Sequence, residues 1–333
     1  MAANQRSPRK QRCIGMFLWG VVFLVIQALG LVVTPRTACA TDPDTIEMLG
    51  ARGEMQHAAI KTASIRFRIV RTGNSYVIPA TYADVQKNLS EANLAGDKEG
   101  LKTLCDRLLT NPAQYAVPWC QAELIVDGEK YRETLFIRND HVAIDVYDGT
   151  TEIKASEGKG FRHAYLYGRM TSQPSILFSE LVSIPRIQFD PWTIVLQSDD
   201  SLLLRRTYKA GHEIDIAIDI RTGFLNSMRF KNAEGSVTHE RQQFSPTLYP
   251  GDIVCPRAVV ETSYNHGKLA QLKISVLDDV RLNQNLPADT FVVGMMGPAR
   301  IVDHRFRAIG KSPREFSSRN AISDVVEFAN SAE

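Results

Sequence analysis

The chain lacks the motifs that usually reveal a catalytic or metal site. Its 333 residues contain no Gly-x-Ser-x-Gly, no His-Glu-x-x-His and no Gly-x-x-x-x-Gly-Lys-Ser/Thr segment, so the common signals of serine hydrolases, zinc proteases and P-loop nucleotide sites are missing. His212-Glu213 and His239-Glu240 lack the second histidine of a zinc motif and fit exposed strand residues. Asp199-Asp200 and Asp278-Asp279 are adjacent carboxylates, which on a strand are expected to point to opposite faces. The sequence therefore predicts no metal, no cofactor and no enzymatic activity.

A surplus of positive charge is also missing from most of the chain. There are 39 Lys and Arg residues against 37 Asp and Glu residues, and 44% of the sequence is hydrophobic, which is an ordinary globular balance. Residues 1–40 contain five basic residues and no acidic one, so the rest of the chain has a net charge of −3. Nucleic-acid binding is therefore excluded, because tracking a phosphate backbone needs an excess of Lys and Arg.

Cysteine is scarce, and only Cys105, Cys120 and Cys255 follow residue 40. In an oxidising compartment Cys105 and Cys120 are candidates for a disulfide. In the chain-entropy model, a disulfide that closes a loop of this length stabilises the folded state by about 3 kcal/mol. Alternatively, all three are free thiols that behave as small buried apolar residues. The sequence leaves both alternatives open, but the absence of a CxxC pair argues against redox or metal chemistry.

The first 40 residues predict the compartment. Four basic residues within 6–12 precede an uncharged run over 13–33, and Ala38-Cys39-Ala40 places small residues at a cleavage site. This order is typical of a secretory signal peptide over residues 1–40. The basic end stays in the cytoplasm, so the rest of the chain is predicted to be exported to the periplasm or cell envelope.

Two other interpretations of this segment stay open. Residues 13–33 are long enough for a retained membrane anchor, because helical residues rising about 1.5 Å each would span a hydrocarbon core of roughly 30 Å. Cys39 also follows small residues, as the lipidated cysteine of bacterial lipoproteins does, although Arg36 replaces the usual aliphatic residue. Each interpretation leaves the rest of the chain on the exported side.

A change of period marks the beginning of the exported part. Pro43 suits the first position of a helix, and apolar or small residues recur every three or four positions up to Ile60. Apolar and charged residues then alternate strictly over 65–69, which indicates a half-buried strand. Two apolar stripes with helical spacing predict a helical-hairpin insert over about 81–110, ending before Pro112.

The region from Trp119 to Val293 is predicted to consist mostly of β-strands. Turn signals such as Asp127-Gly128 separate at least nine strand-like segments, and short turns join antiparallel neighbours. The predicted fold class is mainly β (α+β): a large curved antiparallel sheet or half-open β-barrel, with the leading helix on its concave face. Residues 41–297 are predicted to form this single domain.

Residues 298–333 differ from the preceding part. Residues 300–319 contain six basic and two acidic residues with little periodicity, and a short helix is predicted around Val325 and Ala329. We expect a C-terminal tail, either solvated or in contact with an anionic membrane surface.

The later strands carry a particular succession of turn and strand segments. These segments are Asp219-Ile220-Arg221-Thr222-Gly223, Asn232-Ala233-Glu234-Gly235, Gly251–Arg257, Asp278–Asn283 and Leu286–Phe291. Together with export, one leading helix and a long antiparallel meander, they resemble the periplasmic lipoprotein-carrier (LolA-like) family over roughly residues 45–293. The insert and the tail depart from that family's pattern.

The resemblance implies a fold and a kind of ligand. In that family an unclosed barrel wraps a helix and holds acyl chains on its concave apolar face, so the implied partner is an acyl lipid or a lipoprotein, bound without a cofactor. The family's cavity-lining arginine and aromatic residues do not align with numbered positions in this chain, so no site residue is carried over.

Candidate lining residues come instead from the cleanest apolar strand faces. They are Ile65, Phe67, Ile69, Leu124, Val126, Ile214, Ile216, Ile218, Met228 and Phe230. Alternating apolar positions are also typical of a plain core. With a filled core, the protein would be an interaction scaffold of the cell envelope instead of a lipid carrier, and the sequence does not separate the two.

Overall fold

The computed structural model describes part of the chain: residues 43–71, 102–103, 105–106, 109–110, 120–137, 141–171, 181, 192–208, 210–305 and 311–332. The predicted signal peptide, with its candidate anchor and Cys39, lies outside these residues, as does most of the predicted insert at 81–110. The described residues of the insert are helical, but a helical hairpin is not shown. No helix within the described ranges is long and apolar enough to cross a membrane.

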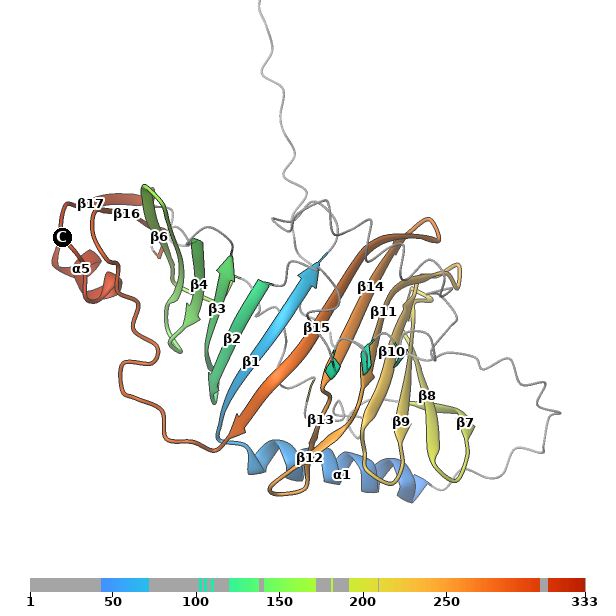
Figure 1. The fold of residues 1–333 in the computed structure, drawn as a ribbon. Coiled ribbons are helices and arrows are strands. Elements are labelled where there is room, and N and C mark those ends of the chain that lie inside the picture. Colours follow the sequence, from blue (N-terminus) through green and yellow to red (C-terminus); the bar gives the residue numbers. More distant parts are fainter. Residues whose placement is uncertain are drawn as a thin grey trace, which may run out of the picture.

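One large open sheet dominates the structure (Figure 1). Its 15 strands follow the order β17-β16-β6-β5-β4-β3-β2-β1-β15-β14-β11-β10-β9-β8-β7. Their bounds are β1 Thr62–Arg71, β2 Cys120–Asp127, β3 Lys130–Ile137, β4 His141–Tyr147, β5 Glu152–Gly158, β6 Phe161–Tyr167, β7 Thr193–Gln197, β8 Ser201–Thr207, β9 Glu213–Asp219, β10 Leu225–Lys231, β11 Val237–Phe244, β14 Ala258–Asn265, β15 Lys268–Leu282, β16 Ala299–Asp303 and β17 Arg314–Ser318. Strands β12 (Thr247–Tyr249) and β13 (Ile253–Cys255) form a separate two-stranded sheet.

The strand order follows from short turns and one long-range pairing. Consecutive strands from β2 to β6 and from β7 to β11 are antiparallel neighbours, as short turns require. The first strand, β1, lies between β2 and β15 and so joins the two halves of the sheet. Since β16 runs parallel to β6, the sheet is mixed. The prediction of a mainly β fold with a large, unclosed sheet is confirmed.

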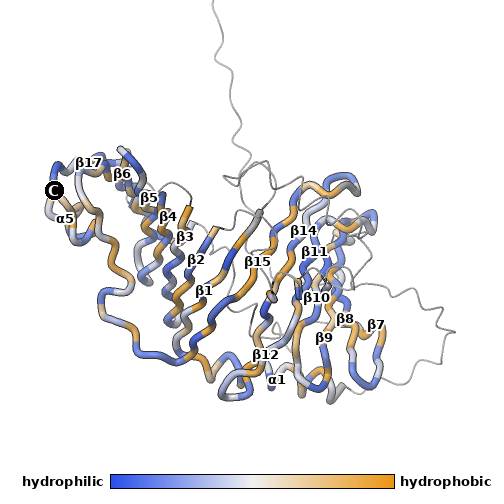
Figure 2. The backbone as a smooth tube through the Cα atoms, in the orientation of Figure 1, coloured by the Kyte–Doolittle hydropathy of each residue, from blue (hydrophilic) through white to orange (hydrophobic). Residues whose placement is uncertain are grey.

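The two faces of the sheet are named here by the side chains of β1. Face A carries Ile65, Phe67 and Ile69, which are all buried, and face B carries Arg66 and Arg68. Hydrophobic and hydrophilic positions alternate along many strands of the sheet (Figure 2). Because directly opposed residues of antiparallel strands lie on the same face, the registers extend these two faces across the whole sheet.

The leading helix, α1 (Pro43–Ala59), packs on face A. It runs across the lower ends of the strands in Figure 1. Leu49 is fully buried against β8, β9 and β10. The Arg52 guanidinium donates to the Arg221 carbonyl oxygen at 2.6 Å, and the Gln56 amide donates to the Asp252 carbonyl oxygen at 2.8 Å. Polar contacts to two turns therefore fix the helix beside its one large buried apolar side chain.

The structure corrects the interpretation of residues 298–333 as a tail. Strand β16 extends the sheet through β6, and β17 pairs with β16. The predicted short helix is present as α5 (Val325–Ser331), where Asp324 caps Val326 N–H at 2.7 Å. Val325 and Ala329 are fully buried in a core on face B of β4, β5, β6 and β16. This core ties the C-terminal segment to the sheet.

The predicted Cys105–Cys120 disulfide is not formed, and all three described cysteines are free. Cys120 begins β2, whereas Asp106, next to Cys105, accepts a hydrogen bond from Ser245 just after β11. Strands β2 and β11 are four positions apart in the sheet, which is about 19 Å at the usual strand spacing. A disulfide needs Cα atoms within about 7 Å. Burial raises the pKa of both thiols, to about 12 for Cys105 and about 11 for Cys120.

Candidate functional site

All ten candidate lining residues lie on face A. Ile65 pairs with Leu124 across β1 and β2, and Met228 pairs with Ile216 across β10 and β9. The registers of β15, β14 and β11 connect these two groups on the same face. The structure therefore places on one face residues that are more than 160 positions apart in the sequence.

The lining candidates form two clusters instead of one continuous surface. The β1 cluster contains Ile65, Phe67, Ile69 and Leu124, with Val126 packed against it. The α1 cluster lies beneath the leading helix and contains Ile214, Ile216, Ile218 and Met228, with Phe230 packed against it. None of the ten side chains is exposed. A role in lining a ligand site, as opposed to forming a plain core, stays a prediction.

A row of polar side chains separates the two clusters on face A. We call it the polar seam: Lys273 and Ser275 from β15, Glu261 and Ser263 from β14, and His239, Arg241 and Gln243 from β11. Arg241 pairs with Met228 of the α1 cluster, and Ser275 pairs with Ile69 of the β1 cluster. The seam thus reaches from one cluster to the other, and Val259 of the β1 cluster lies on β14 between Ser275 and Gln243.

Three seam residues, Arg241, Gln243 and Ser275, are buried, and the other four are half-buried. Burial strengthens electrostatic interactions. Arg241 is 2% exposed, and its burial lowers the pKa of the guanidinium although Glu261 nearby favours the charged form. Glu261 forms an ion pair with Lys273. Burial raises the pKa of Glu261, but Lys273 and Arg241 outweigh that effect and bring it down to about 2. The Glu261 carboxylate is therefore ionised at neutral pH.

Two further seam residues add neutral hydrogen-bonding groups. Burial lowers the pKa of His239, so the imidazole is neutral at pH 7, and its Nδ1 lies 2.9 Å from the Ser263 hydroxyl oxygen. Ser275 is fully buried, and its hydroxyl has no hydrogen-bond partner in the described structure. A buried polar atom without a partner costs free energy, so Ser275 marks a place where a ligand atom could bind.

Sequence reasoning missed the seam. The sequence predicts exposed strand residues at His239-Glu240, but His239 is half-buried in the seam, and Glu240, on face B, is only 3% exposed. Strand β11 has polar residues on both of its faces, which locally is the pattern of a solvated strand. The only sequence signal for burial of β11 is its position between strongly apolar strands. Recognising that position requires the strand registers, which the sequence alone does not provide.

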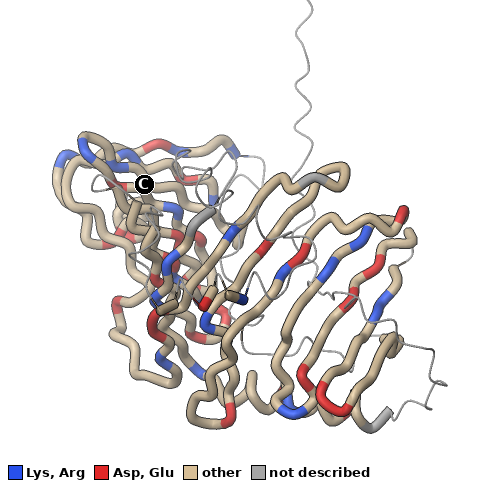
Figure 3. Tube along the Cα trace, turned by 45° about the vertical axis from the view of Figure 1, so that its right-hand side comes forward, with Lys and Arg blue, Asp and Glu red and all other residues tan. Residues whose placement is uncertain are grey.

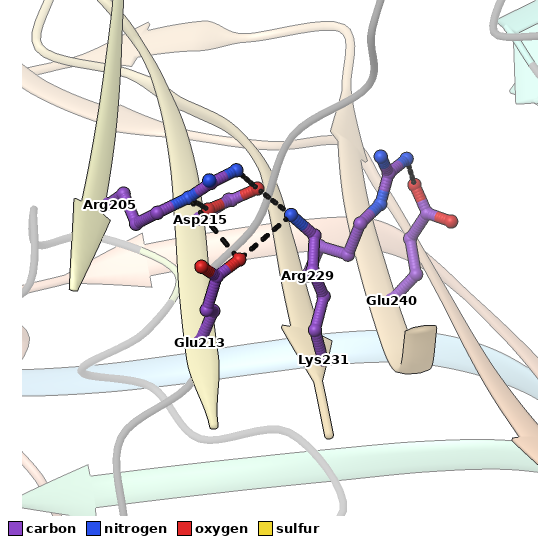
Figure 4. A network of polar contacts seen from close by, with 6 residues as sticks. All are labelled: Arg205, Glu213, Asp215, Arg229, Lys231 and Glu240. Atoms are coloured by element: carbon purple, nitrogen blue, oxygen red, sulfur yellow. Dashed lines mark hydrogen bonds and ion pairs between the residues drawn. The ribbon is translucent and has the colours of Figure 1, made fainter. Parts of the chain in front are cut away.

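Face B of β8–β11 carries a network of ion pairs (Figure 4). Asp215 lies between Arg205, at 2.5 Å, and Lys231, at 2.8 Å, and Arg229 pairs with Glu240 at 2.7 Å. Positive and negative residues alternate across neighbouring strands in this half of the sheet (Figure 3). Such cross-strand pairs stabilise a sheet. Among the described residues, no group of His, Cys, Asp and Glu is placed to hold a metal ion.

Comparisons with known proteins give only distant likenesses. No protein-family model matches the chain, and no curated protein matches it. It is similar to the solved structure of a DUF1329 family protein from Desulfovibrio piger, with 9% identity, a TM-score of 0.45 and coverage of 75% of this chain and 98% of that one.

Two further solved structures carry family names. One is a LolA superfamily protein from Nitrosomonas europaea, with 10% identity, a TM-score of 0.40 and coverage of 76% of this chain and 99% of that one. The other, from Vibrio parahaemolyticus, is a domain assigned to outer membrane lipoprotein sorting, with 11% identity, a TM-score of 0.35 and coverage of 74% and 97%.

Proposed function

We propose that this chain is an exported, non-catalytic protein of the cell envelope that binds the acyl chains of a lipid or lipoprotein on face A. The observation that carries the proposal is the α1 cluster, an apolar surface on an open sheet against which the helix α1 packs. Of the α1 side chains that are described, Leu49 is the one large apolar residue that is buried. Because α1 buries one large apolar side chain on the sheet, an acyl chain can replace the contacts of α1 with the α1 cluster.

The energetics favour such a weakly held cover. Removing an acyl chain of about 16 carbons from water is worth on the order of 12 kcal/mol, at ~0.8 kcal/mol per methylene. A membrane offers the same gain, so a carrier must not lose much free energy when it is empty. Burial of Leu49 contributes about 1.5–3 kcal/mol, half-buried Ile46 adds to it, and the hydrogen bonds of Arg52 and Gln56 contribute roughly 1 kcal/mol each. These contributions are smaller than the gain from burying an acyl chain, and therefore α1 can cover the empty surface and still be displaced.

An interaction scaffold with a filled core is the competing function. Ile216 and Leu204 are fully buried, as they would be in a permanent core. In that case α1 never leaves the sheet, and binding takes place on an exposed surface. The two functions differ in whether the protein carries lipid.

Native mass spectrometry of the exported protein, purified from its source membrane fraction, tests the proposal. We expect a non-covalent acyl-lipid adduct and displacement of a fluorescent fatty-acid probe. Ile216→Asp should abolish the adduct, because it places a carboxylate within the α1 cluster. Ile274→Asp is the matched control, since Ile274 is 1% exposed on face B of β15, and folded protein of this variant should keep the adduct.

If both variants fail to fold, the measurements on the wild-type protein alone distinguish the carrier function from the scaffold function. Lipid-free wild-type protein that also fails to displace the probe would contradict the carrier function and leave the scaffold function. Circular dichroism of each variant shows whether a lost adduct comes from loss of the fold.

A further inference from the structure

We infer that the polar seam binds the anionic head group of the lipid, so that the ligand is an anionic acyl lipid and not a neutral one. This inference rests on the proposed function, because it concerns the same face and the same ligand. It assigns a binding role to Arg241, Lys273 and Ser275. The strand pattern and the family resemblance leave these residues without a role.

The position of the seam suits a head group. Its three strands, β15, β14 and β11, cover about 10 Å at the usual strand spacing, and an apolar cluster borders it on each side. An amphiphile placed on face A with its chain in the α1 cluster therefore has its polar end over the seam. Arg241 of β11 pairs directly with Met228 of β10, so the surface changes from apolar to polar between two neighbouring strands.

The chemistry of the seam suits an acceptor-rich, negatively charged group. Its charged members are two cations, Arg241 and Lys273, and one carboxylate, Glu261. Arginine presents five N–H donors in a planar fork that matches the oxygens of phosphate or carboxylate. Since the imidazole of His239 is neutral at pH 7, it adds hydrogen bonding without adding charge.

Ser275 provides independent evidence for a ligand. Its side chain is fully buried on face A, and its hydroxyl has no hydrogen-bond partner in the part of the chain that the structure describes. It pairs with Ile69 and Val259, at the border of the β1 cluster. A ligand oxygen at this point would accept a hydrogen bond from a hydroxyl that has no partner among the described residues.

The test compares two amphiphiles that differ only in the head. Binding of hexadecyl phosphate and of hexadecanol to the delipidated protein is measured by titration, with inorganic phosphate alone as a third ligand. We expect hexadecyl phosphate to bind at least about tenfold more tightly than hexadecanol, because hydrogen bonds to a charged group are the strong ones. Inorganic phosphate should bind far more weakly, because it gains nothing from the apolar clusters.

Two variants attribute the preference to the seam. In Arg241→Met, the affinities for hexadecyl phosphate and hexadecanol should differ by no more than about twofold. Ser275→Ala should lower the affinity for hexadecyl phosphate by about three- to tenfold and leave the affinity for hexadecanol unchanged. Arg205→Met is the control, because Arg205 belongs to the ion-pair network on face B. It should keep the full preference.

Ser275→Ala also keeps the inference testable if Arg241→Met fails to fold, because it removes a hydroxyl that makes no hydrogen bond in the described structure. Equal binding of the two amphiphiles by the wild-type protein would overturn the inference and leave the proposed function standing. Unchanged hexadecyl phosphate binding in Ser275→Ala, or phosphate alone binding as tightly as the amphiphile, would also overturn it. If neither amphiphile binds, the proposed function itself fails.

Discussion

Glu261→Gln should lower the free energy of unfolding by about 3 kcal/mol at pH 7 and should make stability less dependent on acid. The pKa of Glu261 is about 2 in the folded protein, against an ordinary value of 4.5. Because folding depresses this pKa, the ionised carboxylate contributes stability above about pH 4.5, and that stability is lost as the pH falls towards 2. A shift of this size corresponds to about 3 kcal/mol, and Gln has no such titration.

Urea unfolding at a series of pH values measures this effect. Wild type and Glu261→Gln should differ most at pH 7 and converge as the pH approaches 2. Glu315→Gln is the control, because Glu315 pairs with Arg300 on the surface, with both side chains more than half exposed. It should change stability by less than about 1 kcal/mol. A pH-independent difference for Glu261→Gln would contradict the assignment of the depressed pKa.

Arg229→Met should destabilise the protein by about 3–5 kcal/mol at neutral pH, because it leaves the buried Glu240 carboxylate without its cation. Glu240 is 3% exposed and pairs with Arg229 at 2.7 Å. Burial raises the pKa of Glu240 even in the wild type. Folding therefore favours the protonated form, and this group's contribution to stability falls as the pH rises. Without Arg229 the pKa rises further, so the defect should be larger at pH 8 than at pH 5.

Thermal or urea unfolding of Arg229→Met at both pH values checks this prediction. The double variant Arg229→Met/Glu240→Leu should recover most of the lost stability, since an apolar pair can replace a buried ion pair at little cost. If the double variant is as unstable as the single one, the defect comes from lost packing around Arg229 and not from the unpaired carboxylate.

Much of the architecture could be predicted from local patterns. The alternation over 65–69 gave the first strand, and Asp127-Gly128 predicted the β2–β3 hairpin, in which Gly128 has a φ of 57° that glycine adopts readily. The strict alternation of β9 correctly placed Ile214, Ile216 and Ile218 on one face. Period-2 patterns identify faces within a strand without reference to other strands.

The rest depended on contacts that are distant in the sequence. Residues 299–303 form a strand because β6, more than 130 positions earlier, offers a partner, and a five-residue segment gives little local signal of that. Likewise, Arg241 has the local surroundings of an exposed residue, and only the registers with β14 and β10 place it between two apolar clusters. The division of the lining candidates into two clusters follows from the same registers.

Trp192 provides the most direct test of acyl-chain binding beneath α1. It packs against the α1 cluster, and Trp119 is the only other tryptophan after residue 40. In a Trp119→Phe variant beginning at Thr41, a brominated fatty acid that enters this cluster should quench the remaining fluorescence through contact with the indole. The account predicts saturable quenching that unbrominated fatty acid reverses and that Ile216→Asp abolishes. Fluorescence that brominated fatty acid leaves unchanged would contradict the binding of acyl chains in the α1 cluster.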